Sequence, residues 1–165
     1  MQQKITRNPW PRWAKAVSFT LLVLIVGFVF SNSMEIATES SQKSGSLLTL
    51  LLEWLPFLRG WFTEHILRKL GHFAEYTLVG MVLMLCLRSC TVRLWANITK
   101  PILGGVLIAL MDETIQLFVA GRSGQISDVW LDSSGVCTGL LVMGCILLIL
   151  ERYFAHRRRE TRGTV

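Results

Sequence analysis

The stretch that decides the fold spans residues 102–150, "ILGGVLIALMDETIQLFVAGRSGQISDVWLDSSGVCTGLLVMGCILLIL". Two apolar runs, 102–120 and 134–150, flank a short polar segment in which two glycines surround Arg122. Each run approaches the roughly 17 to 25 residues that a membrane-spanning helix needs. Glycines allow a tight turn that directs the Arg122 guanidinium back toward the helices. The stretch therefore predicts two spanning helices joined by a hairpin.

Two further apolar runs, 14–30 and 72–87, lie upstream of this stretch. The chain of 165 residues is 52% hydrophobic and only 17% charged, and its mean hydropathy is +0.47, which exceeds the usual globular mixture. We therefore predict an all-α fold in a single domain over residues 1–165. It is a small transmembrane bundle of four spans, at about 14–30, 72–88, 102–120 and 134–151.

A shorter apolar patch, "SLLTLLLEWLPFLRGWF" at residues 46–62, is interrupted by charged residues, a proline and a glycine, and it carries two Trp and two Phe. This composition predicts an interfacial helix that lies flat on the outer membrane surface, within an extracytoplasmic loop 31–71. The first apolar run resembles a secretory signal, but "FVFSNSMEIA" lacks an A-x-A cleavage site. We expect a retained anchor.

The positions of lysine and arginine predict the orientation, because cytoplasmic flanks carry the excess of both residues. Twelve of the 17 lie in the tail before and at the start of the first run, in the segment 88–100, and after residue 151. Both termini should therefore be cytoplasmic in a multi-pass protein of the cell membrane. Anionic lipids account for the net charge of +6, which leaves little reason to expect a nucleic-acid partner.

Polar side chains that are unusual in a membrane span gather, in this topology, in the outer half of the bundle. An ionised residue at the centre of a span costs about 2.5 to 3.5 kcal/mol on insertion scales. Function or mutual pairing must therefore offset this cost for these residues. In the second and third runs a spacing of three or four residues places them on one helix face. Asp128 and Asp132 would also share a face if the fourth helix starts early. The polar residues of this set are His72, Glu75, Tyr76, Asp112, Glu113, Gln116, Asp128 and Asp132.

Three basic residues at the same end, Arg68, Lys69 and Arg122, are candidates for holding a phosphate or other anionic head group. Among the acidic residues, a divalent cation would find ligands in the carboxylates of Asp112, Glu113, Asp128 and Asp132, and His72 would serve as an acid or base. The alternative is that these groups only pair with one another to hold the bundle together. Glu75 with Arg68, and Asp112 with Arg122, are two such pairs.

Three segments of the chain resemble the VanZ-like membrane proteins: "FSNSMEIATESSQKS" (30–44), "RKLGHFAEY" (68–76) and "DETIQLFVAGRSGQISDVWLDSSG" (112–135). The resemblance runs from about residue 30 to residue 141. Its ordered pattern is Arg-Lys-x-x-His-Phe-x-x-Tyr, Asp-Glu-x-x-Gln-x-Phe and Gly-Arg-x-x-x-x-x-Asp. Some members have Asn where this chain has Asp132. The first named member of the family is linked to low-level resistance to the glycopeptide teicoplanin.

The resemblance implies action on the cell envelope and lower susceptibility to teicoplanin-type glycopeptides. A protein that binds membrane lipids, a lipid-linked cell-wall precursor or another envelope component would use the outward polar site without turnover. The alternative is a membrane-embedded transferase or hydrolase that acts on a lipid-linked phosphate or pyrophosphate. A proton-coupled transporter is disfavoured because the inner halves of the runs are apolar. The sequence leaves open whether the protein is an enzyme.

Overall fold

The computed structural model describes residues 10–58, 60 and 62–163, which form helices and connecting turns without a strand. This confirms the predicted all-α fold. The helices are α1 (Arg12–Ser33), α2 (Ala37–Trp54), α3 (Glu64–Cys90), α4 (Thr99–Gln116) and α5 (Ile126–Gly163), with short 3-10 turns at η1 (Pro56–Leu58) and η2 (Trp95–Asn97).

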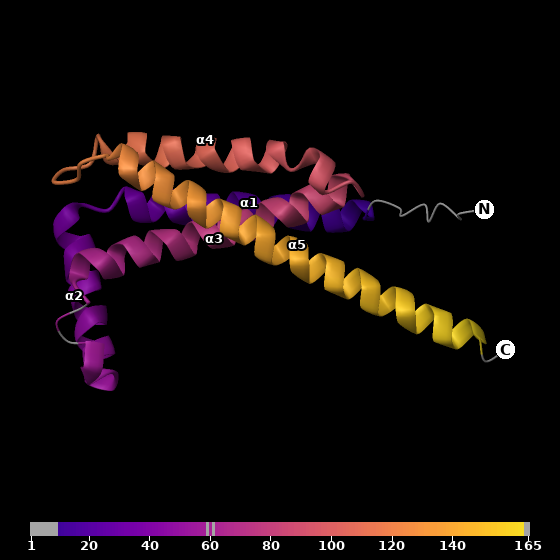
Figure 1. Ribbon diagram of the computed structural model, residues 1–165. Coiled ribbons are helices and arrows are strands. Elements are labelled where there is room, and N and C mark those ends of the chain that lie inside the picture. Colours follow the sequence, from indigo (N-terminus) through magenta and orange to yellow (C-terminus); the bar gives the residue numbers. More distant parts are fainter. Residues whose placement is uncertain (1–9, 59, 61, 164–165) are drawn as a thin grey trace.

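The chain reverses direction between successive long helices. Figure 1 shows α1, α3, α4 and α5 lying lengthwise, whereas α2 crosses the end of the bundle at which α1 ends and α3 begins. The start of α1 and the end of α5 lie at the opposite end from α2. The 38 residues of α5 extend about 57 Å at 1.5 Å per residue, so its last turns project beyond the other helices.

Among the described residues, three helices are long and apolar enough to cross a membrane: Arg12–Ser33, Glu64–Cys90 and Ile126–Arg157. The shorter α4 has 18 residues, among them Lys100 and two acidic residues, and it packs against α1, α3 and α5. Three of the predicted spans therefore meet the requirements of length and composition. A spanning role for α4 and the orientation of the bundle stay predictions.

The helices extend beyond several of the predicted spans, because hydropathy marks the apolar part of a helix and not its polar ends. The third helix begins at Glu64, where the Thr63 hydroxyl caps it by accepting a hydrogen bond from the Ile66 N–H at 3.3 Å. The predicted loop 31–71 thus contains α2 and the first two turns of α3. In the same way α5 begins at Ile126, eight residues before the predicted start, while α4 ends at Gln116.

The predicted interfacial segment 46–62 is also shifted, since the helix there, α2, spans Ala37–Trp54. Trp54 and Phe57 are 83% and 74% exposed, which suits side chains at a membrane surface. Trp61, another aromatic residue of that segment, lies outside the described residues. A location of α2 at the outer membrane surface stays a prediction.

The closest approach between helices is a glycine seam along α3 and α5. A Cβ atom on Gly139 would lie 2.0 Å from the Thr77 carbonyl oxygen, and one on Gly80 would lie 2.2 Å from the Val136 carbonyl oxygen. No side chain fits at either position. Small residues at such positions allow the dispersion contacts that hold helices together in lipid.

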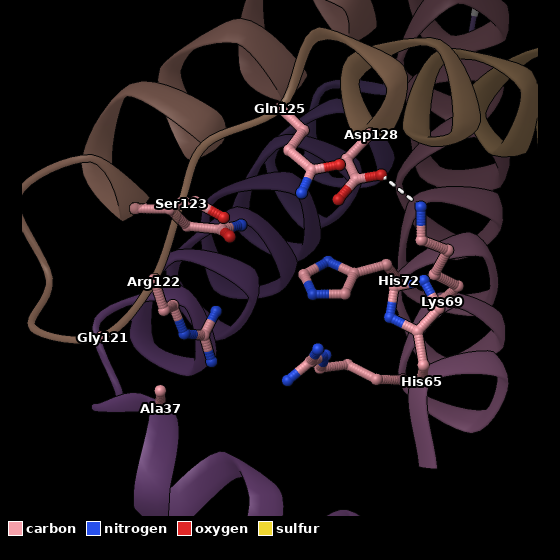
Figure 2. A pocket seen from close by; sticks show the side chains of 11 residues that line it. Ala37, His65, Lys69, His72, Gly121, Arg122, Ser123, Gln125 and Asp128 are labelled. Carbon is pink, nitrogen blue, oxygen red and sulfur yellow. Dashed lines mark hydrogen bonds and ion pairs between the residues drawn. The ribbon is translucent and has the colours of Figure 1, made fainter. Parts of the chain in front are cut away.

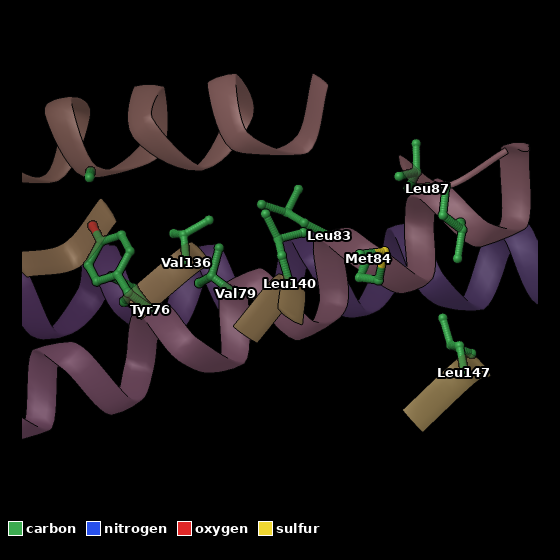
Figure 3. Close-up of a cluster of buried hydrophobic side chains, with 11 residues drawn as sticks. Tyr76, Val79, Leu83, Met84, Leu87, Val136, Leu140 and Leu147 are labelled. Atoms are coloured by element: carbon green, nitrogen blue, oxygen red, sulfur yellow. The ribbon is translucent and has the colours of Figure 1, made fainter. Parts of the chain in front are cut away.

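Along this seam the buried side chains form one core (Figure 3), which includes Tyr76, Val79, Met84, Val136 and Leu140. The outer faces of the helices carry exposed apolar side chains instead. That distribution is expected where the surroundings of a bundle are lipid. Among the described residues, the buried carboxylates Asp112, Glu113 and Asp132 all lie toward one end.

Candidate functional site

The predicted polar residues come together at the end of the bundle that α2 crosses. The helices α3, α4 and α5 and the loop between α4 and α5 each supply part of the set. From α3 come Arg68, Lys69, His72, Glu75 and Tyr76; from the last turns of α4 come Asp112, Glu113 and Gln116; from the connecting loop comes Arg122; from the first turns of α5 come Asp128 and Asp132.

The glycine seam positions two of these helices against each other at this end. A Cβ on Gly135 would lie 3.1 Å from the Tyr76 Cβ, so the start of α5 presses directly on α3. Asp132 precedes Gly135 by three residues and His72 precedes Tyr76 by four, so each pair is about one helical turn apart. Close packing at the seam therefore places Asp132 beside His72.

A layer of buried acidic and polar side chains lies beneath the surface of this end. Asp112, Asp132 and Tyr76 are fully buried, and Glu113 and Gln116 nearly so. The Gln116 amide donates hydrogen bonds to Asp112 Oδ2 at 3.3 Å and to Glu113 Oε1 at 3.2 Å. The second Glu113 oxygen, Oε2, accepts from the backbone N–H of Gln125 at 2.9 Å, which ties the loop to α4.

Other oxygens of this layer have no such partner. Among the described residues, Asp112 Oδ1, both carboxylate oxygens of Asp132 and Nδ1 of His72 are buried without a hydrogen bond. One donor atom from each of these three side chains lies within 4.8 Å of the other two. Buried polar atoms without a partner are rare in proteins and call for an explanation.

Above the acidic layer opens a cavity of about 110 Å³ that we call the basic pocket. Figure 2 shows Arg122 and His72 directed into one space, with Lys69 turned toward Asp128 at its edge. Lys69 Nζ lies 2.7 Å from Asp128 Oδ1. The pocket is lined by Ala37, His65, Arg68, Lys69, His72, Gln116, Gly121, Arg122, Ser123, Gln125 and Asp128.

A second cavity, of about 220 Å³, adjoins the basic pocket and shares Arg68, His72 and Arg122 with it. It extends toward α1 and α2, where Asn32 donates a hydrogen bond from Nδ2 to Glu75 Oε1 at 2.7 Å. The Asn32 carbonyl oxygen accepts from Arg122 Nη2 at 3.2 Å. Asn32 thus joins α1, α3 and the loop at the site.

Sequence reasoning did not single out Asn32 or His65. Asn32 lies in "FSNSMEIA", where a polar amide at the end of an apolar run was the available signal. His65 was assigned to an outer loop, whereas it lies on the first turn of α3 and lines the basic pocket. The second omission follows from starting the predicted span at His72, which left His65 in the predicted loop 31–71.

Cationic groups face one another across the basic pocket. Burial, together with the neighbouring Arg68 guanidinium, lowers the pKa of Arg122 below its ordinary value. Arginine still stays charged, because its ordinary pKa is far above neutral. Two guanidinium groups that repel each other across a cavity favour the binding of an anion between them.

Mutual pairing explains some of the acidic residues and not others. Glu75 is held by Asn32, Glu113 by Gln116 and Gln125, and Asp128 by Lys69. Asp132 has no such hydrogen bond among the described residues, whereas Asp112 accepts one from Gln116 and lies beside the buried hydroxyl of Tyr76. A purely structural role therefore does not account for the Asp112–Asp132 pair.

These features define a multi-pass helical membrane protein with a basic pocket above a buried acidic layer at one end of its bundle. The family model described as VanZ/LLP1 matches residues 18–149, and the chain belongs to this family. The match confirms the resemblance that the polar motifs indicated. A comparison with curated proteins and with solved structures finds no match.

Proposed function

We propose that this VanZ-like protein binds the anionic head group of an envelope lipid, or of a lipid-linked cell-wall precursor, in an outward-facing basic pocket. By acting on the envelope in this way it lowers susceptibility to teicoplanin-type glycopeptides. The observation that carries the proposal is the convergence of Arg68 and Arg122 on one cavity. The excess of lysine and arginine near the other end of the bundle supports the outward orientation.

Guanidinium groups suit this ligand because their paired N–H donors match the oxygens of a phosphate. Arg68 is held on a regular helix, and Arg122 is held by its hydrogen bond to the Asn32 carbonyl. Gly121, which precedes Arg122, has a φ of +76°, a conformation that favours glycine and turns the loop back toward the bundle.

An apolar groove beside the basic pocket supports a lipid-linked ligand over a free anion. The groove has a volume of about 380 Å³ and is lined by Ile66, Leu70, Phe73, Leu131 and Lys69. Lys69 also lines the basic pocket, so both cavities border this residue. A ligand with a phosphate head and an apolar chain would place each part in a matching environment.

The proposal is tested by teicoplanin susceptibility in cells that express wild type or variants. His72→Ala, Asp112→Asn, Glu113→Gln and Arg122→Ala should each abolish the envelope phenotype while expression and membrane insertion stay near wild type. Arg93→Ala is the matched control, because Arg93 is exposed in the connection between α3 and α4, away from the basic pocket. If all four variants retain the phenotype at normal expression, the shared site has no role in it.

The second candidate function is a transferase or hydrolase that acts on a lipid-linked phosphate or pyrophosphate. The observation that favours it is that His72 lines the basic pocket and also lies beside Asp112 and Asp132. An acid or base in contact with the bound anion is what such chemistry requires. An untargeted lipid comparison of cells with wild type and with His72→Ala separates the two functions, because only an enzyme converts a substrate that accumulates in the variant.

A further inference from the structure

We infer that His72, Asp112 and Asp132 form a binding site for one divalent transition-metal ion at the floor of the basic pocket. The inference rests on the proposed function for the role of the ion, which would bind a phosphate oxygen of the head group. Its evidence is separate and consists of the burial, hydrogen bonding and separation of the three side chains.

The donor atoms have the separation that a single ion bridges. One donor from each of His72, Asp112 and Asp132 lies within 4.8 Å of the other two. Zinc bonds to imidazole nitrogen and to carboxylate oxygen are about 2.0–2.2 Å long, so small side-chain movements bring three such donors onto one ion. The three residues come from α3, α4 and α5, which the seam and the loop hold together.

The carboxylates at this point lack the partners that their neighbours have. Asp112 and Asp132 have no exposed surface, and three of their four oxygens accept no hydrogen bond within the described part of the chain. The nearby Lys69 is paired with Asp128. Two adjacent buried carboxylates repel each other and lose their hydration, and a bound cation offsets both unfavourable contributions.

The mixture of donors indicates the class of metal. Magnesium and calcium prefer oxygen ligands alone, whereas an imidazole with carboxylates suits zinc and neighbouring transition metals. Three protein ligands leave at least one coordination position free, as in catalytic zinc sites. His72 lines both cavities together with Arg68 and Arg122, so the proposed metal site adjoins the basic pocket.

Glu113 and Asp128 are excluded from the set by their contacts. Glu113 accepts hydrogen bonds from Gln116 and Gln125 on both of its oxygens, and Asp128 forms the ion pair with Lys69. The proposed metal site therefore includes only some of the acidic residues at this end of the bundle. It uses Asp132 and not Asp128, although both lie on the same helix one turn apart.

The test is a titration of the purified full chain in detergent with Zn²⁺ alone, after removal of metal with a chelator. Wild type should bind one Zn²⁺ per chain. Asp112→Asn and Asp132→Asn should each weaken the affinity by at least about 100-fold, more than the 10- to 100-fold effect of residues that only support a ligand. Asp128→Asn is the matched control and should retain the affinity of wild type.

X-ray absorption of the zinc-loaded wild type should show nitrogen and oxygen neighbours with an imidazole signature, and His72→Ala should lose that signature. These wild-type measurements stand even if a variant fails to fold. If protons alone neutralise the carboxyl groups, folded wild type takes up no Zn²⁺. That result would overturn the inference. Equal affinity in wild type, Asp112→Asn and Asp132→Asn would overturn it too.

Failure of the metal site and failure of the proposed function give different results. If wild type binds no Zn²⁺ but Arg122→Ala still loses the envelope phenotype, head-group binding stands without the metal. If Zn²⁺ binds as expected but Arg122→Ala keeps the phenotype, the metal site stands and the proposed function is wrong.

Discussion

Gly139 on α5 lies directly against the backbone of Thr77 on α3, where a Cβ atom would be 2.0 Å from the Thr77 carbonyl oxygen. The contact belongs to the seam that continues through Gly135 to Tyr76 and so to the functional end of the bundle. Because backbone atoms form one side of the contact, no side-chain movement relieves a clash there. The seam therefore controls how α3 and α5 are aligned, and with it the separation of His72 and Asp132.

Replacement of Gly139 with Ala should destabilise the protein. The added methyl group meets backbone, so overpacking should lower the free energy of unfolding by at least about 1–3 kcal/mol. Thermal unfolding in detergent, followed by circular dichroism, measures the effect. Gly104→Ala is the control, since nothing lies within 4 Å of its added Cβ and alanine favours a helix. Equal stability of the two variants would show that the seam is looser than described.

The Lys69–Asp128 ion pair should contribute little to stability. Its side chains are 34% and 28% exposed, and ion pairs in contact with solvent are usually worth about 0.2–1 kcal/mol. A double-mutant cycle of Lys69→Ala, Asp128→Ala and the double variant should give a coupling free energy below about 1 kcal/mol. A coupling free energy above about 2 kcal/mol would mean that Lys69 stabilises the fold through the ion pair. Ligand binding would then not be needed to explain Lys69 at this position.

Removal of the Arg122 guanidinium should weaken binding of a lipid-linked pyrophosphate to the protein in nanodiscs. A hydrogen bond to a charged group contributes about 1.5–3 kcal/mol, which corresponds to a loss of roughly 10- to 150-fold in affinity. Arg122→Lys should be intermediate, because lysine keeps the charge but not the paired donors. Arg93→Ala should bind as wild type does. Unchanged affinity in Arg122→Ala would show that the basic pocket is not the binding site of this ligand.

The orientation predicts that a reporter fused after Val165 is cytoplasmic and that one inserted near Gln42 is external. In a variant without the four native cysteines, a cysteine at Ser46 on α2 or at Gly60 should react with an impermeant reagent added from outside. Ser46 is the safer position, because Gly60 has a φ of +94°, which disfavours other residues. Labelling only from the cytoplasmic side would reverse the orientation and place the basic pocket inside the cell.

The sequence alone predicted the all-α fold, the family and the end of the bundle at which the polar residues gather. These properties depend on the apolar content of long segments and on ordered motifs, and both are visible without a structure. The predicted spans did not show where α3 and α5 begin, because a helix continues past its apolar part as long as its backbone hydrogen bonds and caps are satisfied.

Only the tertiary structure decided which acidic residue has which partner. Asp128 and Asp132 lie one turn apart on α5 and look equivalent in the sequence, yet Asp128 meets Lys69 while Asp132 lies beside His72 and Asp112. The role of Asn32 as a link between α1, Glu75 and Arg122 was likewise absent from the pattern. Such pairings depend on the rotation and alignment of helices distant in the chain, which are set by close contacts such as Gly139 with Thr77.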